Sequence, residues 1–356
     1  MGQCPDNCQS ANRHTHFNGE VLDTVKRVLG AGLVVALCAT LGACSTGTGS
    51  EAKDDGPTFP DQRIEYTVPF GPGGGTDLIS RKLAAVAEPI LGQQVVIVNK
   101  PGGSGTIGPS EVMRAKPDGY TIGLSNNQGA VFTPMTVDLP YDGPEDYQPI
   151  IKLSELPCVL VVRDDSPYKT LADFTKAAQA DPGSLTIGVA GKLTACDLVW
   201  QGQFAKEANV EAVTAPFTGG AGEAATALLG GKTDGFLGDI IAVLPHIRSG
   251  DMRALVVFQE KRHSLLKETP SIVEAGYSNT LPITYFVMGP AGMPKSVVDT
   301  LYSSFAEAIK SAEFQDWAAG TGYVLDPKGP ADLLAELQSQ RAQYEKIISV
   351  LGVGKK

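Results

Sequence analysis

The sequence predicts an α/β protein of two lobes, each a mostly parallel, doubly wound sheet covered by helices. Short runs rich in β-branched residues alternate with stretches of helical apolar period, the pattern that produces such sheets. The alternation runs once, breaks near residue 160 and starts again. A chain of 356 residues is long enough for two lobes of ordinary size.

In the first half, short β-rich runs predict three strands, and helices fill the gaps between them. The second of the two helices is shorter than the first, whose apolar positions Leu78, Ile79, Leu83 and Val86 follow a helical period. The predicted strands are 64–68, 95–99 and 120–124, and the predicted helices are 77–91 and 109–115.

The second half repeats this order. Strands are predicted at 159–162, 185–189, 211–215, 235–237 and 253–258, with helices that end near 180, 208, 229 and 248. A last strand at 285–288 precedes helices at 295–311 and 331–350. The apolar runs near 160 and 285 are candidates to cross between lobes. We therefore expect a discontinuous first lobe, residues 62–160 and 286–356, around a second lobe of residues 161–285.

The loop between the first strand and the first helix is the most informative stretch. Gly73, Gly74 and Gly75 follow Phe70 and precede Thr76 and Asp77, so glycines open a helix. Free backbone N–H groups at the positive end of a helix dipole suit an anion. Glycine also serves where the backbone needs a positive φ or a close approach, so a turn without a ligand remains an alternative. Thr76 or Asp77 is expected to cap the helix.

The N-terminus reads as an export signal. Lys26 and Arg27 precede an apolar run at 28–39, and Leu-Gly-Ala precede Cys44, which resembles a bacterial lipobox. We expect a signal region at 1–43, a lipidated Cys44 and a polar tether over 44–61. Translation starting at Val21 or Val25 is a hypothesis for the unusual residues 1–20. The alternative, a membrane anchor, is disfavoured because the apolar run is shorter than the ~20 residues that span a bilayer.

The net charge and the number and spacing of the cysteines argue against further classes of function. The net charge of −10 argues against nucleic acid as a partner. After cleavage only Cys44, Cys158 and Cys196 remain, so no C-x-x-C pair indicates zinc. A disulfide between Cys158 and Cys196 is possible outside the cytoplasm, but separated cysteines are more often buried thiols. We expect no metal and no cofactor.

Nucleotide and catalytic motifs match poorly. Gly103, Gly105 and Gly108 have the spacing of a dinucleotide fingerprint, but the next strand ends in Ser125-Asn126 instead of an acid. Ser104 has no partner of catalytic spacing. The remaining feature is a set of loops rich in N–H and hydroxyl groups, which suit a small carboxylate.

Several segments together resemble a known family. They are V-P-F-G-P-G-G-G-T-D at 68–77, N-K-P-G-G-S-G-T-I-G at 99–108, K-P-D-G-Y-T-I at 116–122 and L-L-G-G-K-T-D at 228–234, and P-S-I-V-E-A-G-Y and G-P-A-G-M-P follow later. This order is similar to the solute receptors of tripartite tricarboxylate transporters, the TctC-like or Bug family. The resemblance covers residue 61 to the C-terminus and implies a periplasmic-binding-protein (type II) fold with a carboxylate held between lobes.

The resemblance also implies roles for particular residues. It predicts an extracytoplasmic, non-enzymatic and monomeric receptor that delivers its carboxylate to membrane permease subunits and meets the membrane only through its lipid. An exported enzyme or a sensory receptor on the same scaffold remains the alternative. The ligand-binding residues implied are Phe70, Gly73, Gly74, Gly75, Thr76, Asp77, Gly103, Ser104, Gly105, Thr106, Ser125, Asn126, Thr194, Thr218, Gly219 and Asp239.

Overall fold

The fold is that of a computed structural model, which describes residues 59–217, 220–278 and 281–355. The predicted signal region, Cys44 and all but the last residues of the tether lie outside these ranges, as do Thr218 and Gly219. Across the described ranges, none of the helices has both the length and the apolar character that crossing a membrane requires.

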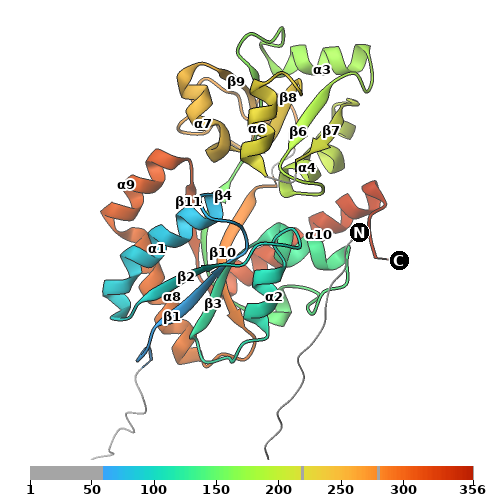
Figure 1. Cartoon of the computed structure of the whole chain (residues 1–356). Coiled ribbons are helices and arrows are strands. Elements are labelled where there is room, and N and C mark those ends of the chain that lie inside the picture. The colour runs from blue at the N-terminus through green and yellow to red at the C-terminus, as the bar shows by residue number, and fades with distance from the viewer. Residues whose placement is uncertain (1–58, 218–219, 279–280, 356) are drawn as a thin grey trace, which may run out of the picture. The chain divides into compact units, whose positions relative to one another are not determined.

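The first sheet has six strands in the order β11-β4-β10-β3-β1-β2 (Figure 1). Strands β1 and β2 and strands β1 and β3 pair in parallel, whereas β10 and β11 add antiparallel pairs with β3 and β4. The strands are β1 (Ile64–Val68), β2 (Val95–Asn99), β3 (Thr121–Asn126), β4 (Tyr147–Leu156), β10 (Ile283–Pro290) and β11 (Val324–Lys328).

The second sheet has five strands in the order β7-β6-β8-β5-β9. Strand β6 pairs in parallel with β7 and β8, and β5 pairs antiparallel with β8 and β9. The strands are β5 (Cys158–Arg163), β6 (Thr186–Val189), β7 (Val213–Pro216), β8 (Gly235–Asp239) and β9 (Met252–Phe258). The βα repetition read from the sequence thus yields two sheets of α/β type.

Both sheets are mixed, with more antiparallel pairing than the sequence predicted. In each, three parallel strands are followed by an antiparallel strand that arrives from the other lobe, β10 in the first sheet and β5 in the second. A strand entering from the opposite lobe runs against its neighbours, which the local pattern of a βα unit does not encode.

The chain passes between the sheets at two prolines. Pro157 separates β4 from β5, and Pro282 precedes β10. Residues 158–160, expected in the first lobe, therefore pair in the second sheet, and residues 283–285, expected in the second lobe, pair in the first. The apolar composition continues across each crossing, so only proline, which lacks a ladder donor, marks the boundary.

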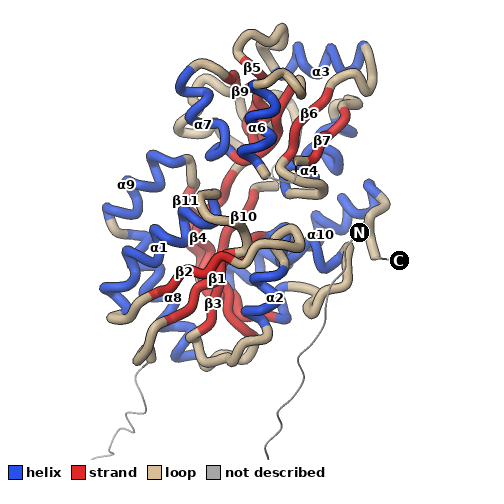
Figure 2. Tube along the Cα trace, viewed as in Figure 1, coloured by secondary structure: helices blue, strands red, loops and turns tan. Residues whose placement is uncertain are grey.

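Helices cover both sheets, as Figure 2 shows. In the first lobe α1 packs against α8 and α9, while α2 and α10 contact β3 and β4. In the second lobe α6 and α7 pack together. The ring of Phe174 in α3 packs edge-on against that of Trp200, with the ring centroids 6.2 Å apart. The helices are α1 (Gly75–Leu91), α2 (Ile107–Met113), α3 (Leu171–Ala180), α4 (Ala195–Val199), α5 (Ala205–Glu207), α6 (Ala221–Leu229), α7 (Ile240–Ser249), α8 (Lys295–Lys310), α9 (Ala312–Thr321) and α10 (Pro330–Leu351).

Strand β4 was not predicted from the sequence because polar residues interrupt its apolar pattern. Lys152 on this strand is fully buried, and its ammonium lies 2.6 Å from carboxylate oxygens of Glu155 and Asp326 and 2.7 Å from Glu336. Pro149 sits beside a register shift in the pairing with β10. Burial of Lys152 is tolerable only because three carboxylates surround it, and two of these, Asp326 and Glu336, come from distant parts of the chain.

Candidate functional site

The glycine loop after β1 is held by Asp77, whose side chain is 3% exposed. Its Oδ2 accepts the N–H of Gly73 at 2.9 Å and the Nε–H of Arg81 at 2.9 Å. Its Oδ1 accepts from Asn99 Nδ2, also at 2.9 Å, and Asn99 donates in addition to the carbonyl of Phe70. Asp77, which was predicted to contact the ligand, therefore holds in place the loop that carries the other predicted contacts.

These hydrogen bonds also set the charge state of Asp77. Burial disfavours the charged carboxylate, but the bonds from Arg81, Gly73 and Asn99 outweigh it and lower the pKa of Asp77 below its ordinary value. The predicted cap is different from the one observed: helix α1 starts at Gly75 with Gly74 at the N-cap, and neither Thr76 nor Asp77 caps it. The backbone N–H groups of the first turn stay available.

Three loops of the first lobe pack against one another. Gly105, at φ 89°, lies so close to Phe70 that a Cβ there would come within 2.7 Å of the ring. A Cβ on Gly129 would lie 3.3 Å from the Gly105 carbonyl oxygen, and the Gly129 N–H donates to Asn126 Oδ1 at 2.8 Å. The sequence-predicted Phe70, Gly105 and Asn126 thus belong to one surface at the carboxyl ends of β1, β2 and β3.

The other predicted residues of this lobe differ in exposure. Ser104 is exposed with a positive φ of 54°, and Gly103 is exposed beside it. The Thr106 hydroxyl is engaged locally, because it donates to the Gly103 carbonyl at 2.8 Å. The Ser125 hydroxyl is buried and has no hydrogen-bond partner among the described residues. Ser125 is therefore a predicted residue of this lobe whose buried hydroxyl makes no hydrogen bond within the described part of the chain.

In the second lobe the loop after β6 is held by Asp197. Its Oδ2 accepts the N–H of Leu193 at 2.8 Å, and its Oδ1 accepts from Gln201 Nε2 at 2.5 Å. Thr194 is half-buried at the N-cap of α4 and approaches the Gly191 carbonyl at 3.4 Å, the upper end of hydrogen-bond range. Thr218 and Gly219 lie outside the described residues.

The two lobes meet where α1 and α7 begin. A Cβ on Gly75 would lie 3.3 Å from Ile241 Cδ1 and 3.4 Å from the Tyr323 hydroxyl, so a side chain at this position would require Ile241 to shift by a few tenths of an ångström. The Tyr323 hydroxyl donates to the Gly75 carbonyl, and the Tyr285 hydroxyl lies 3.8 Å from the same Cβ position. The N-termini of a first-lobe helix and a second-lobe helix therefore come together.

Asp239 stands at this junction. It is the N-cap of α7 and accepts the Ala242 N–H at 3.1 Å. Burial raises the pKa of the Asp239 carboxyl, although the backbone N–H groups partly offset this. Burial and the Asp239 charge also raise the pKa of Tyr285, and burial raises that of Tyr323. Both phenols are thus neutral hydrogen-bond donors at neutral pH.

Neither tyrosine was predicted from the sequence as a candidate site residue. Tyr285 was read only as part of a crossing strand, and Tyr323 lies just before β11, a strand that was not predicted. The only signal was an aromatic residue with a polar end in each place, which most buried tyrosines share. Their convergence on Gly75 depends on contacts across 210 or more positions of sequence.

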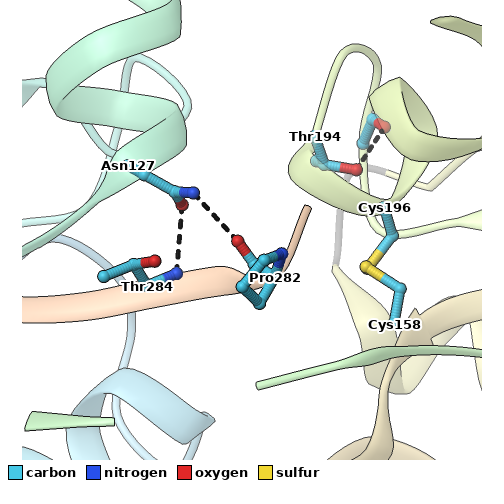
Figure 3. Close-up of a disulfide and its surroundings, with 7 residues drawn as sticks. Asn127, Cys158, Thr194, Cys196, Pro282 and Thr284 are labelled. Carbon is cyan, nitrogen blue, oxygen red and sulfur yellow. Dashed lines mark hydrogen bonds between the residues drawn. A yellow bond between two sulfur atoms is a disulfide. The ribbon is translucent and has the colours of Figure 1, made fainter. Parts of the chain in front are cut away.

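The hydrogen bonds of Asn127 and a disulfide hold the crossing strands in place (Figure 3). Asn127, fully buried after β3, donates from Nδ2 to the Pro282 carbonyl at 2.9 Å and accepts from the Thr284 N–H at 3.1 Å. Cys158 and Cys196 form a disulfide, which corrects the interpretation of these residues as buried thiols. Sequence alone did not pair them because 38 positions separate them and proximity arises only from the fold.

A hollow of about 760 Å³ also lies at the crossing and contains none of the predicted residues. Its walls include Glu155 and Asp326 of the first lobe and Gln259, Glu260 and His263 of the second. Glu155 and Asp326, with Glu336, form a carboxylate group compact enough for a metal ion, but the Lys152 ammonium already bonds all three.

Two α/β lobes joined by crossing strands, with loops at the strand ends facing one another, define the solute receptors of the periplasmic-binding-protein class. The sequence model of the tripartite tricarboxylate transporter family receptor matches residues 79–353. The chain belongs to this family, whose members are receptors and not enzymes.

Individual proteins agree with this assignment. The "UPF0065 protein in tcbD-tcbE intergenic region" of Pseudomonas sp. (strain P51) is 34% identical over 297 residues, which is 82% of this chain and 86% of the relative. Among solved structures, the R. palustris protein Rpa4515 with adipate has a TM-score of 0.77 at 26% identity, covering 83% of this chain and 99% of that one. MatC from Rhodopseudomonas palustris with bound malate has a TM-score of 0.73 at 25% identity, covering 82% and 100%.

Proposed function

We propose that this receptor binds a small organic carboxylate between its lobes, at the loops where α1 and α7 begin. The observation that carries the proposal is the approach of Gly75 to Ile241, Tyr285 and Tyr323. It brings the positive ends of two helix dipoles together in a protein whose overall charge of −10 would otherwise repel an anion.

The donors at this junction are neutral. The Asp77 carboxylate is engaged by its own loop, where it accepts the Gly73 N–H, so the N–H groups at 74–76 and the hydroxyls of Ser125 and Tyr285 are the groups left for a carboxylate. Asp239 of the second lobe is an acceptor and suits a ligand hydroxyl or amine. Thr194, Thr218 and Gly219 complete the second-lobe side of the proposed site.

The solved relatives support the ligand class, since one contains malate and another adipate, both small organic carboxylates. The hollow at the crossing is a poorer candidate. Glu155, Glu260 and Asp326 all line it, and three carboxylates oppose the entry of an anion despite nearby basic residues.

A thermal-shift screen of mono-, di- and tricarboxylates tests the proposal. A ligand present at about 100 times its Kd stabilises the folded state by about 2.7 kcal/mol, which raises the unfolding temperature measurably. Tyr285→Phe should weaken binding of the best carboxylate about tenfold, the usual effect of one hydrogen bond to a charged group. Tyr168→Phe, against Phe174 in the second lobe, is the control. No stabilisation by any carboxylate would contradict the proposal.

We also propose that the receptor is lipid-anchored at Cys44 and delivers its ligand to membrane permease subunits. The basic residues, apolar run and Leu-Gly-Ala-Cys sequence support the anchor, and membership of a tripartite transporter family supports the permease. Cys44→Ala should block lipidation and release the protein from the membrane fraction. A variant that remains membrane-bound as firmly as the wild type would refute the anchor.

A further inference from the structure

We propose that the Cys158–Cys196 disulfide is a positioning element, which holds the second-lobe ligand loop, residues 190–194, in place against a crossing strand. The claim about the loop rests on geometry alone. Its consequence for affinity rests on the proposed function, because it assumes that this loop contacts the carboxylate.

The two cysteines lie in the crossing strand and in the helix that follows the ligand loop. Cys158 is the first residue of β5, directly after the crossing at Pro157, and it pairs with Asp239 at the end of β8. Cys196 is in the first turn of α4, two residues after Thr194. The bond therefore ties the loop to the strand that enters the lobe, beside Asp239, as Figure 3 shows for Thr194 and both cysteines.

The loop needs an external constraint. Leu193 has φ 56°, a left-handed conformation that non-glycine residues rarely adopt. The helical stretch that follows, 195–207, is irregular, because a π-helical segment, Trp200–Phe204, interrupts it after five α-helical residues. The π-helical interruption breaks the regular hydrogen-bond pattern directly behind the first turn, so this helix constrains its first turn less than a regular α-helix does.

The first lobe solves the same problem without a disulfide. Its loop leads into the 17-residue helix α1, and Asp77 forms an ion pair with Arg81 at 2.9 Å. The corresponding Asp197 bonds to the neutral side chain of Gln201, and no ion pair to Asp197 occurs within the described part of the chain. The covalent bond of the second lobe thus supplies the constraint that a regular helix and an ion pair supply in the first.

The state of the bond can be changed chemically. A dithiol reduces it by thiol–disulfide exchange: the dithiol is oxidised to its cyclic disulfide, and the two sulfurs of the protein become thiols. Both cysteines are at most 4% exposed, so the reagent reaches them only when the region opens. The double variant Cys158→Ala/Cys196→Ala removes the bond without that requirement.

Hydrogen exchange of the ligand-free protein tests the proposal without any ligand. We expect amides at 190–199 to exchange about tenfold faster in the double variant and in dithiothreitol-reduced wild type, with amides at 70–78 unchanged. Leu255→Ala, in the buried core of β9, is a control for general destabilisation of the lobe. The control should not accelerate 190–199 selectively.

Several results would overturn the proposal. Unchanged exchange at 190–199 after reduction would do so, and so would acceleration spread evenly over the second lobe or equal acceleration in Leu255→Ala. Calorimetry with malate and adipate as probes then examines affinity, where the double variant should bind several-fold more weakly. Equal binding by both proteins would overturn the link to affinity. A wild type that binds neither probe would count against the proposed ligand and leave the exchange result decisive for the loop.

Discussion

Asp77 and Asp197 each accept the backbone N–H of the residue four positions earlier, at 2.9 Å from Gly73 and 2.8 Å from Leu193. Each also accepts from the side chain four positions later, Arg81 or Gln201. The loop after β1 and the loop after β6 are thus held by the same pattern of hydrogen bonds, although their sequences differ.

Removing the Asp77 carboxylate should loosen the glycine loop after β1 and also lower the free energy of unfolding. Asp77→Ala leaves the Gly73 N–H without its acceptor and removes one of the two acceptors of the Asn99 amide, and we expect a loss of about 2–3 kcal/mol of unfolding free energy. Urea denaturation measures it. Asp299→Ala, which breaks an exposed helix pair with Lys295, should change stability by less than about 0.5 kcal/mol. Equal effects in both variants would show that the Asp77 contacts are not structural.

Gly105 and Gly183 separate backbone strain from packing. Both have positive φ, 89° and 79°, but a Cβ on Gly105 would meet the Phe70 ring at 2.7 Å, whereas nothing lies within 4 Å of one on Gly183. Gly105→Ala should therefore cost about 1–3 kcal/mol more than Gly183→Ala, the range for overpacking. It should also displace Phe70 and weaken carboxylate binding. Matching unfolding curves for the two variants would contradict a rigid Phe70 contact.

Asn127 should control how the lobes move. Asn127→Ala leaves the buried Thr284 N–H without an acceptor, at a cost of about 1–3 kcal/mol. Asn127→Asp keeps that acceptor but places a fully buried carboxylate against the Pro282 carbonyl, so at neutral pH it should be at least as destabilising as Asn127→Ala. Small-angle scattering with and without the best carboxylate should show a smaller change in radius of gyration for Asn127→Ala than for the wild type. An identical change would mean that Asn127 has no part in the hinge.

His263 should make stability depend on pH. Its Nδ1 accepts the Leu265 N–H at 3.2 Å, and its Nε2 lies 3.2 Å from the Gly322 carbonyl, an arrangement that requires the neutral ring with a proton on Nε2. Burial lowers the pKa of His263 below the ordinary 6.5, while the bond to Gly322 partly offsets the shift. The unfolded chain therefore takes up a proton at a higher pH than the folded one.

The sign follows from that order. The contribution of His263 is fully present above pH ~6.5 and is lost as the pH falls from there toward the folded-state pKa, with a slope of at most about 1.4 kcal/mol per pH unit. Urea denaturation between pH 7.5 and 5.5 should show this slope in the wild type and in His246→Gln, but not in His263→Gln. A slope that persists in His263→Gln would assign it to other groups.

Local patterns in the sequence were sufficient for much of the fold. The β-rich run 64–68 became β1 and the glycines at 73–75 became the turn into α1, because both are properties of a few consecutive residues. Strand β4 was missed because its buried Lys152 looks like a solvent-facing residue until Asp326 and Glu336 are placed around it.

The sequence by itself determined the family, the two series of βα units and the loops that carry the candidate site, since strand composition, helical period and glycine turns are local. Only the tertiary structure decided that Cys158 bonds Cys196, that Asn127 holds Thr284 and that Tyr323 reaches Gly75. These contacts join residues 38, 157 and 248 positions apart. No local preference encodes them, because they form only when both lobes have packed and the strands have crossed.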